Sequence, residues 1–119
     1  MDSRHNFGCV FDELSNKVII IGGSENEITS EILDLNQDDP AWEYGPELPN
    51  NSPAEDLVLV SNPDFGIVLI GGNNPITDVA KSAVWELVND QWQYLPNLQL
   101  SAPRTSFVAF SIPDSFSKC

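Results

Sequence analysis

The side chains that most often carry chemistry are few in this chain. His5 is the only histidine among the 119 residues, so a histidine-based metal site lacks a second ligand, and no Ser-His-Asp or Cys-His set can be assembled. Cys9 and Cys119 form neither a CxxC metal motif nor a disulfide framework. The pair Asp38-Asp39 lacks the spacing of a calcium loop. The sequence therefore predicts no catalytic residue, no metal ligand and no cofactor site.

The overall charge excludes several classes of partner. The chain has 18 acidic and 5 basic side chains and a net charge of −13, whereas binding to nucleic acids or to anionic membranes needs clustered Lys and Arg. The 41% hydrophobic content is too high for a disordered acidic tail. Since no apolar run exceeds four residues, no segment is predicted to span a membrane. We expect a folded protein whose protein partner presents a basic surface.

The cysteines and the polar start of the chain bear on the compartment. Without a disulfide framework, and with no signal peptide visible from Met1 onward, the sequence predicts a cytoplasmic protein. An extracellular location stays open if a signal peptide precedes Met1. Cys9 lies in an apolar stretch between Phe7 and Phe11, and is expected to be a small buried side chain.

The chain repeats itself with a period near 50 residues. NKVIIIGG, which ends at Gly22-Gly23, returns as FGIVLIGG, which ends at Gly71-Gly72, 49 residues later (71 − 22). WEYGPEL, which starts at Trp42, returns as WQYLPNL, which starts at Trp92, 50 residues later (92 − 42). Two further sets recur in the same order: SEILDL at 30–35 with SAVWEL at 82–87, and SRHNF at 3–7 with PAEDL at 53–57 and PRTSF at 103–107. Four landmarks in one order indicate an internal repeat.

Each period is expected to contain four short β-strands and no helix, because β-branched runs alternate with turns rich in Gly, Pro, Asn and Asp. The nine prolines all fall between the expected strands, where a missing N–H does no harm. The expected strands are 7–11, 17–21, 32–35 and 42–44, then 56–61, 66–70, 83–87 and 91–94, and finally 106–111. Four strands in a repeat of this length are typical of a β-propeller blade.

This pattern resembles the kelch-repeat β-propeller family. The shared features are an apolar strand that ends in a double glycine, a later strand with an aromatic residue, a Trp, a Leu-Pro pair, and an Arg that opens the next blade. The matching residues are Arg4, Gly22, Gly23, Trp42, Leu48 and Pro49, then Gly71, Gly72, Trp85, Trp92, Leu95 and Pro96, and lastly Arg104. Leu33, aligned with Trp85, departs from the usual tyrosine. Ala54 stands where an arginine is expected.

The resemblance implies an all-β fold of four-stranded antiparallel blades in an incomplete, open propeller. Residues 1–52 would form blade 1, residues 53–102 blade 2, and residues 103–119 the first strand of a third blade. Closed propellers have about four to eight blades. We therefore expect the chain to be a fragment of a longer propeller or to complete one by self-association.

The marked residues each have a structural and a functional interpretation. The glycine pairs are expected to adopt positive φ at tight loops, since a dinucleotide-binding loop would need a GxGxxG motif that opens a helix. Trp42 and Trp92 are expected to pack between sheets, with ligand stacking as the alternative. Arg4 and Arg104 are expected to bond neighbouring carbonyls or acids and to set the blade-to-blade register. A substrate-binding ring of arginines is the alternative.

The resemblance also implies a function. It predicts a non-enzymatic module that binds a protein partner through the loops between blades. The alternative is a fragment of a kelch-scaffold enzyme, galactose-oxidase-like or sugar-isomerising, whose catalytic residues lie outside this chain. Fold alone does not decide between the two. The single histidine and the absence of a paired ligand set favour the first interpretation, so we expect no enzymatic activity.

Overall fold

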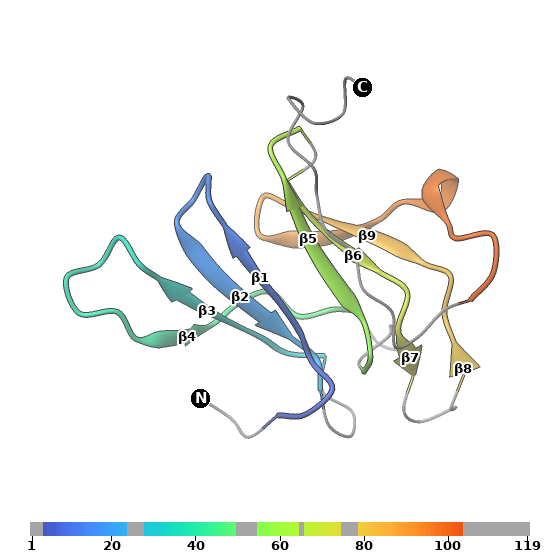
Figure 1. Cartoon of the computed structure of the whole chain (residues 1–119), viewed down its shortest axis with the longest axis horizontal. Coiled ribbons are helices and arrows are strands. Elements are labelled where there is room, and N and C mark those ends of the chain that lie inside the picture. The colour runs from blue at the N-terminus through green and yellow to red at the C-terminus, as the bar shows by residue number, and fades with distance from the viewer. Residues whose placement is uncertain (1–3, 24–27, 50–54, 65, 75–78, 104–119) are drawn as a thin grey trace, which may run out of the picture.

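Two four-stranded antiparallel sheets make up most of the structure (Figure 1). The computed structural model describes residues 4–23, 28–49, 55–64, 66–74 and 79–103. Sheet 1 contains β1 (Gly8–Asp12), β2 (Lys17–Ile21), β3 (Ser30–Asp34) and β4 (Trp42–Tyr44), in that order. Sheet 2 contains β5 (Val58–Asn62), β6 (Gly66–Ile70), β9 (Val84–Val88) and β10 (Gln91–Tyr94), also in chain order. The predicted all-β class, with four-stranded sheets that do not close into a ring, is confirmed.

Two short elements were not expected from the sequence. β7 (Asn73–Asn74) and β8 (Val79–Ala80) pair with each other in the connection from β6 to β9. They are too short for a strand period to show in the sequence. η1 (Pro96–Leu98) is a single 3-10 turn after β10, and it starts at a proline, which is well tolerated in a first turn. No helix in the described ranges is long and apolar enough to cross a membrane.

The observed strand boundaries agree best with the predicted ones where a β-branched run ends at a glycine or a turn. The predicted bounds of β2, β4, β6 and β10 are confirmed. β1, β5 and β9 begin one or two residues later than predicted, and β3 begins at Ser30, two residues earlier. Ser30 is polar, but its Oγ donates a hydrogen bond to the Pro46 carbonyl at 2.8 Å, so the residue can start a buried strand. The predicted strand at 106–111 lies outside the described residues.

The hydrogen-bond register corrects one alignment between the two repeats. Trp85 of β9 pairs with Tyr94 of β10. In sheet 1 the matching Tyr44 of β4 pairs with Glu31 of β3. Glu31 is therefore the counterpart of Trp85, and the alignment of Trp85 with Leu33 is wrong by two residues. The connection that follows the double glycine is longer in the second repeat, where it contains β7 and β8, so the third strand is displaced along the chain.

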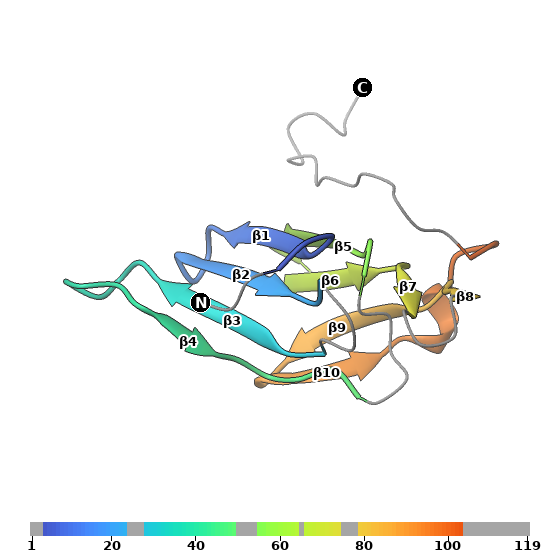
Figure 2. The ribbon, with the colours of Figure 1, turned by 90° about the horizontal axis from the view of Figure 1, so that it is seen from below.

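The two sheets pack against each other, and the core lies between them. Figure 2 shows β1 and β5 along one edge of the pair and β4 and β10 along the other. The buried core residues are Ile19 and Ile21 of sheet 1, Leu59, Ile67, Leu69 and Trp92 of sheet 2, and Leu48 and Leu57 from the segment between the sheets. Gly8 permits close approach of β1 and β5, because a Cβ there would clash with Leu57 and lie 3.2 Å from Leu59 Cγ.

One face of sheet 1 points away from sheet 2. Side chains alternate along each strand, so the neighbours of Ile19 and Ile21 lie on the opposite face. No described strand packs against that face (Figure 1). We call it the outer face of sheet 1; its apolar residues are Cys9, Phe11, Val18, Ile20, Leu33 and Trp42. Cys9 is exposed, so the expectation of a buried cysteine is wrong, because the alternation directs its side chain away from the core.

Candidate functional site

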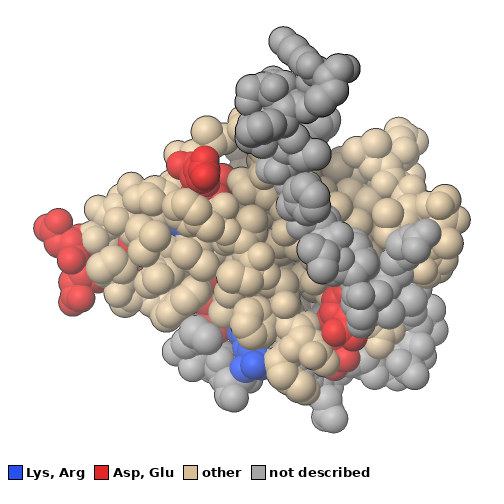
Figure 3. Space-filling view, viewed as in Figure 1, with Lys and Arg blue, Asp and Glu red and all other residues tan. Residues whose placement is uncertain are grey.

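Acidic side chains are prominent on the molecular surface. Figure 3 shows several separate acidic areas and little basic surface on the face that it views. One end of the sheets, where the hairpins join β1 to β2, β3 to β4, β5 to β6 and β9 to β10, collects many of them. We call it the turn end. Its acidic residues are Asp12, Glu13, Asp34, Asp38, Asp39, Asp64 and Asp90. Among the described residues there, Lys17 is basic, and it pairs with Asp34 at 3.8 Å.

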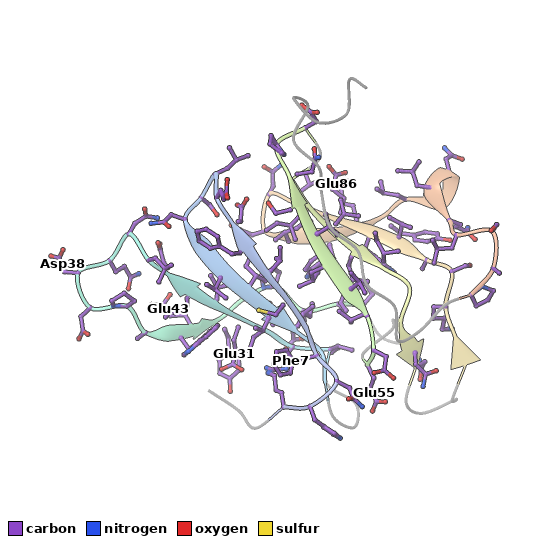
Figure 4. The ribbon with its side chains drawn as sticks, viewed as in Figure 1. Phe7, Glu31, Asp38, Glu43, Glu55 and Glu86 are labelled. Atoms are coloured by element: carbon purple, nitrogen blue, oxygen red, sulfur yellow. The ribbon has the colours of Figure 1, made fainter. Side chains whose placement is uncertain are left out.

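Arg4 forms a buried cluster at the opposite end of sheet 1. Its Nε donates to Glu31 Oε2 at 2.9 Å, and Nη1 donates to the carbonyls of Gly22 at 2.9 Å and Thr29 at 3.2 Å. Nη2 donates to Thr29 Oγ1 at 3.0 Å. Figure 4 labels Glu31 and Phe7 at this end. These bonds reach an acid and backbone carbonyls that belong to sheet 1 and its connections, and the role of Arg4 in the register between blades stays a prediction.

The double glycines have the backbone conformation that other residues rarely adopt. The φ angles are 72° at Gly22, 82° at Gly23, 63° at Gly71 and 99° at Gly72. A Cβ on Gly23 would clash with the carbonyl oxygen of His5 and lie 2.8 Å from Phe7 Cβ. The Gly22 carbonyl accepts its bond from Arg4. In sheet 1 the glycine pair therefore turns the chain tightly where the arginine binds.

Trp42 and Trp92 occupy matching strand positions in different surroundings. Trp92 is 7% exposed in the core between the sheets, and its Nε1 donates to the Pro46 carbonyl at 3.2 Å. Trp42 lies on the outer face of sheet 1 and is half-buried. The ring of Trp85 lies 5.2 Å from that of Tyr94, and its indole N–H has no hydrogen-bond partner among the described residues. Of the two repeat tryptophans, Trp92 packs between described sheets and Trp42 does not.

A pocket of about 270 Å³ opens between the two sheets at the turn end. The hairpins that join β1 to β2 and β5 to β6 lie at this end, at the top of Figure 1. The apolar wall of the pocket includes Leu14, Ile32 and Leu87, and the charged groups that line the pocket are Asp12, Lys17 and Asp90. Apolar walls with a few charged groups are typical of a binding site.

Asp12 joins the two sheets beside this pocket. Its Oδ1 accepts a hydrogen bond from Ser61 Oγ of sheet 2 at 2.8 Å, and its Oδ2 accepts bonds from the backbone N–H and the hydroxyl of Ser15. Burial disfavours the charged carboxylate and acts to raise its pKa, but the hydrogen bonds from Ser15 and Ser61 outweigh burial. The pKa of Asp12 therefore lies below its ordinary value.

Stability is expected to fall as Asp12 becomes protonated. A carboxyl group whose pKa is lowered by folding stabilises the fold above its unfolded pKa, and the contribution is lost as pH falls through the folded pKa. The loss therefore lies on the acid side of the reference value of 3.8. In urea unfolding between about pH 5 and pH 2, the midpoint of the Asp12→Asn variant should depend less on pH than that of the wild type. Asp38→Asn, in an exposed turn, is the control. If both variants reduce the pH dependence of the urea midpoint equally, the effect cannot be assigned to the hydrogen bonds of Asp12.

The remaining chemistry-bearing residues form no reactive group in the described ranges. No three His, Cys, Asp or Glu side chains there are arranged to hold a metal ion. His5 is exposed. Arg104 and Cys119 lie outside the described residues. What the described arrangement offers is a pocket and an acidic end, which suit binding.

Glu31 binds Arg4, and the sequence analysis did not identify it as a site residue. The two repeats contain a signal for it once their register is corrected. Ala54 stands in the place of Arg4, and Trp85 stands in the place of Glu31. Both members of the buried ion pair therefore change together, as expected because an interior charge is costly without its partner.

Comparisons with protein-family models and with curated proteins find no match. The architecture therefore defines the class of this chain. It consists of two four-stranded antiparallel sheets that pack face to face and are consistent with two blades of a β-propeller.

Proposed function

We propose that this chain is part of a kelch-type β-propeller that binds a protein partner and has no catalytic role. The observation that carries the proposal is the pocket between the sheets, which lies within the acidic turn end. The repeated double glycines with positive φ, Gly22-Gly23 and Gly71-Gly72, support the kelch assignment. The pocket is lined by hairpins within the blades, so the proposed partner contacts these hairpins as well as the loops between blades.

A Lys or Arg side chain suits this pocket. Its aliphatic stem can lie against Leu14 and Leu87, while its charge lies near Asp90. The net charge of −13 attracts a basic partner at longer range. The proposed partner is therefore a protein segment that combines apolar and basic residues.

Binding of a Lys/Arg-rich peptide is expected to weaken as salt is added. The measurement is fluorescence anisotropy of a labelled peptide at low and at physiological ionic strength, with a Glu-substituted peptide of equal length as control. Asp90→Asn should weaken binding about two- to five-fold, the range of one exposed charge pair. Glu47→Gln, an exposed change at the other end of the sheets, should leave binding unchanged. Equal binding of the Glu-substituted peptide, or no effect of salt, would contradict the proposal.

The enzymatic alternative needs a different measurement. It places the catalytic residues outside this chain, so a binding assay does not address it. An activity screen with sugars and primary alcohols, run on a longer protein that contains this chain, separates the two functions. Turnover of any of these substrates would support the enzyme.

A further inference from the structure

The contact between the two sheets joins unlike faces. Sheet 1 contributes the face with Ile19 and Ile21, and sheet 2 contributes the face with Leu69 and Trp92. The contact is therefore directional, head to tail, and not a meeting of equivalent surfaces. Each sheet has a second face, and these two faces are also unlike each other.

The strand register shows which residues of the two sheets are equivalent. Gly8 pairs with Ile21, and Val58 pairs with Ile70. Ile21 and Ile70 are the residues that directly precede the two double glycines. The inner strands therefore correspond at a separation of 50 residues (58 − 8). The face of sheet 2 that points away from sheet 1 carries Val58, Val60 and Val68, and we call it the second face of sheet 2.

Each of these faces repeats a surface that is already buried in the core. Val58, Val60 and Val68 stand where sheet 1 has Gly8, Val10 and Ile19, which face sheet 2. On the outer face of sheet 1, Phe11, Val18 and Trp42 stand where sheet 2 has Ser61, Ile67 and Trp92, which face sheet 1. By strand position the two faces therefore correspond to the two halves of the observed contact between the sheets, with Glu31 of the outer face in the place of Trp85 as one difference.

Side-chain volumes are also complementary at one pair of facing positions. Within the chain, Gly8 leaves room for Leu59, whose Cγ would lie 3.2 Å from a Cβ at position 8. In a contact between the outer face of sheet 1 and the second face of sheet 2, Val58 takes the place of Gly8, and Cys9 takes the place of Leu59. At this pair of positions a larger residue on one face is matched by a smaller one on the other, which conserves the packed volume there.

We propose that the outer face of sheet 1 docks on the second face of sheet 2 in another copy of this chain. The contact between copies then repeats the contact between the two sheets of one copy. Directional contacts form a closed ring when the rotation per copy permits it. Closed propellers have about four to eight blades and each copy supplies two, so a ring takes about two to four copies. Phe11, now 47% exposed, becomes buried in it.

Two charge variants test this proposal by blocking one face each. Phe11→Glu blocks the outer face of sheet 1, and Val60→Glu blocks the second face of sheet 2. By size-exclusion chromatography with light scattering, the wild type should have about two to four times the 13.1 kDa mass of one chain. Each variant alone should have the mass of one chain, and their mixture should form a complex of two chains. Leu14→Glu, an equal change in an exposed turn, should keep the wild-type mass.

Several results would overturn the proposal. One is a wild-type chain that stays at the mass of one copy, which would indicate that another sheet or a different protein covers these faces. Others are a mixture without the two-chain complex, or a dimer formed by either variant alone. If a variant fails to fold, the thiol of Cys9 provides a second measurement in a Cys119→Ser chain. Its reaction with a thiol reagent should slow several-fold as protein concentration rises, and an unchanged rate would also overturn the proposal.

Discussion

Replacing Arg4 with alanine is expected to lower the free energy of unfolding by about 3–5 kcal/mol. The variant removes an arginine that forms an ion pair with Glu31, whose side chain is 5% exposed. It also removes the donors to the carbonyls of Gly22 and Thr29. The measurement is urea unfolding at one fixed protein concentration, because self-association would otherwise change the apparent stability.

The double variant Arg4→Ala/Glu31→Ala is the matched control for this prediction. It should lose less stability than Arg4→Ala alone, because the buried Glu31 carboxylate is removed together with the arginine that binds it. Arg4→Lys should recover only part of the loss, since an ammonium cannot reproduce the planar set of guanidinium donors. An Arg4→Ala variant that unfolds at the wild-type urea concentration would show that the pair does not stabilise the fold.

Trp92→Ala is expected to cost a similar amount, about 3–5 kcal/mol. The change opens a cavity between the sheets, where Trp92 is 7% exposed, and it removes the bond to the Pro46 carbonyl. Trp42→Ala is the matched comparison, because the same side chain is removed at the equivalent strand position on the outer face. In a Val60→Glu background, which keeps that face uncovered, the loss at Trp42 should be clearly smaller.

Equal losses at the two tryptophans would contradict this assignment. They would mean that the contribution of a tryptophan to the free energy of unfolding depends on its position in the repeat and not on burial between the described sheets. The stability lost by Trp42→Ala can be compared with and without Val60→Glu. A larger loss without Val60→Glu would indicate that self-association covers the outer face and buries Trp42.

The strands that are apolar and punctuated by glycine could be predicted from the sequence. The runs that end at Ile21 and Ile70 stop at double glycines, so both their bounds and their equivalence are visible. The third strand was harder to place, because Ser30 and Glu31 look like loop residues until their partners are known. Those partners, Pro46 and Arg4, are distant in sequence, and only the folded chain brings them close.

Burial was the least predictable property. Alternation along β1 shows that Cys9 and Gly8 lie on opposite faces, but it does not show which face another sheet covers. The same holds for Trp42 and Trp92, which look alike in the repeat. Local sequence thus determines the two faces of each sheet, and the way in which the sheets pack determines which face becomes core.

The carbonyl of Pro46 accepts hydrogen bonds from Ser30 of sheet 1 and from Trp92 of sheet 2. One backbone oxygen thus accepts hydrogen bonds from both sheets. If either sheet unfolds, one of these two bonds is lost. At the other end, the bond between Asp12 and Ser61 fastens the sheets in the same way. Opening one sheet therefore also breaks bonds that its neighbour shares, and we expect the two sheets to unfold together as one cooperative unit.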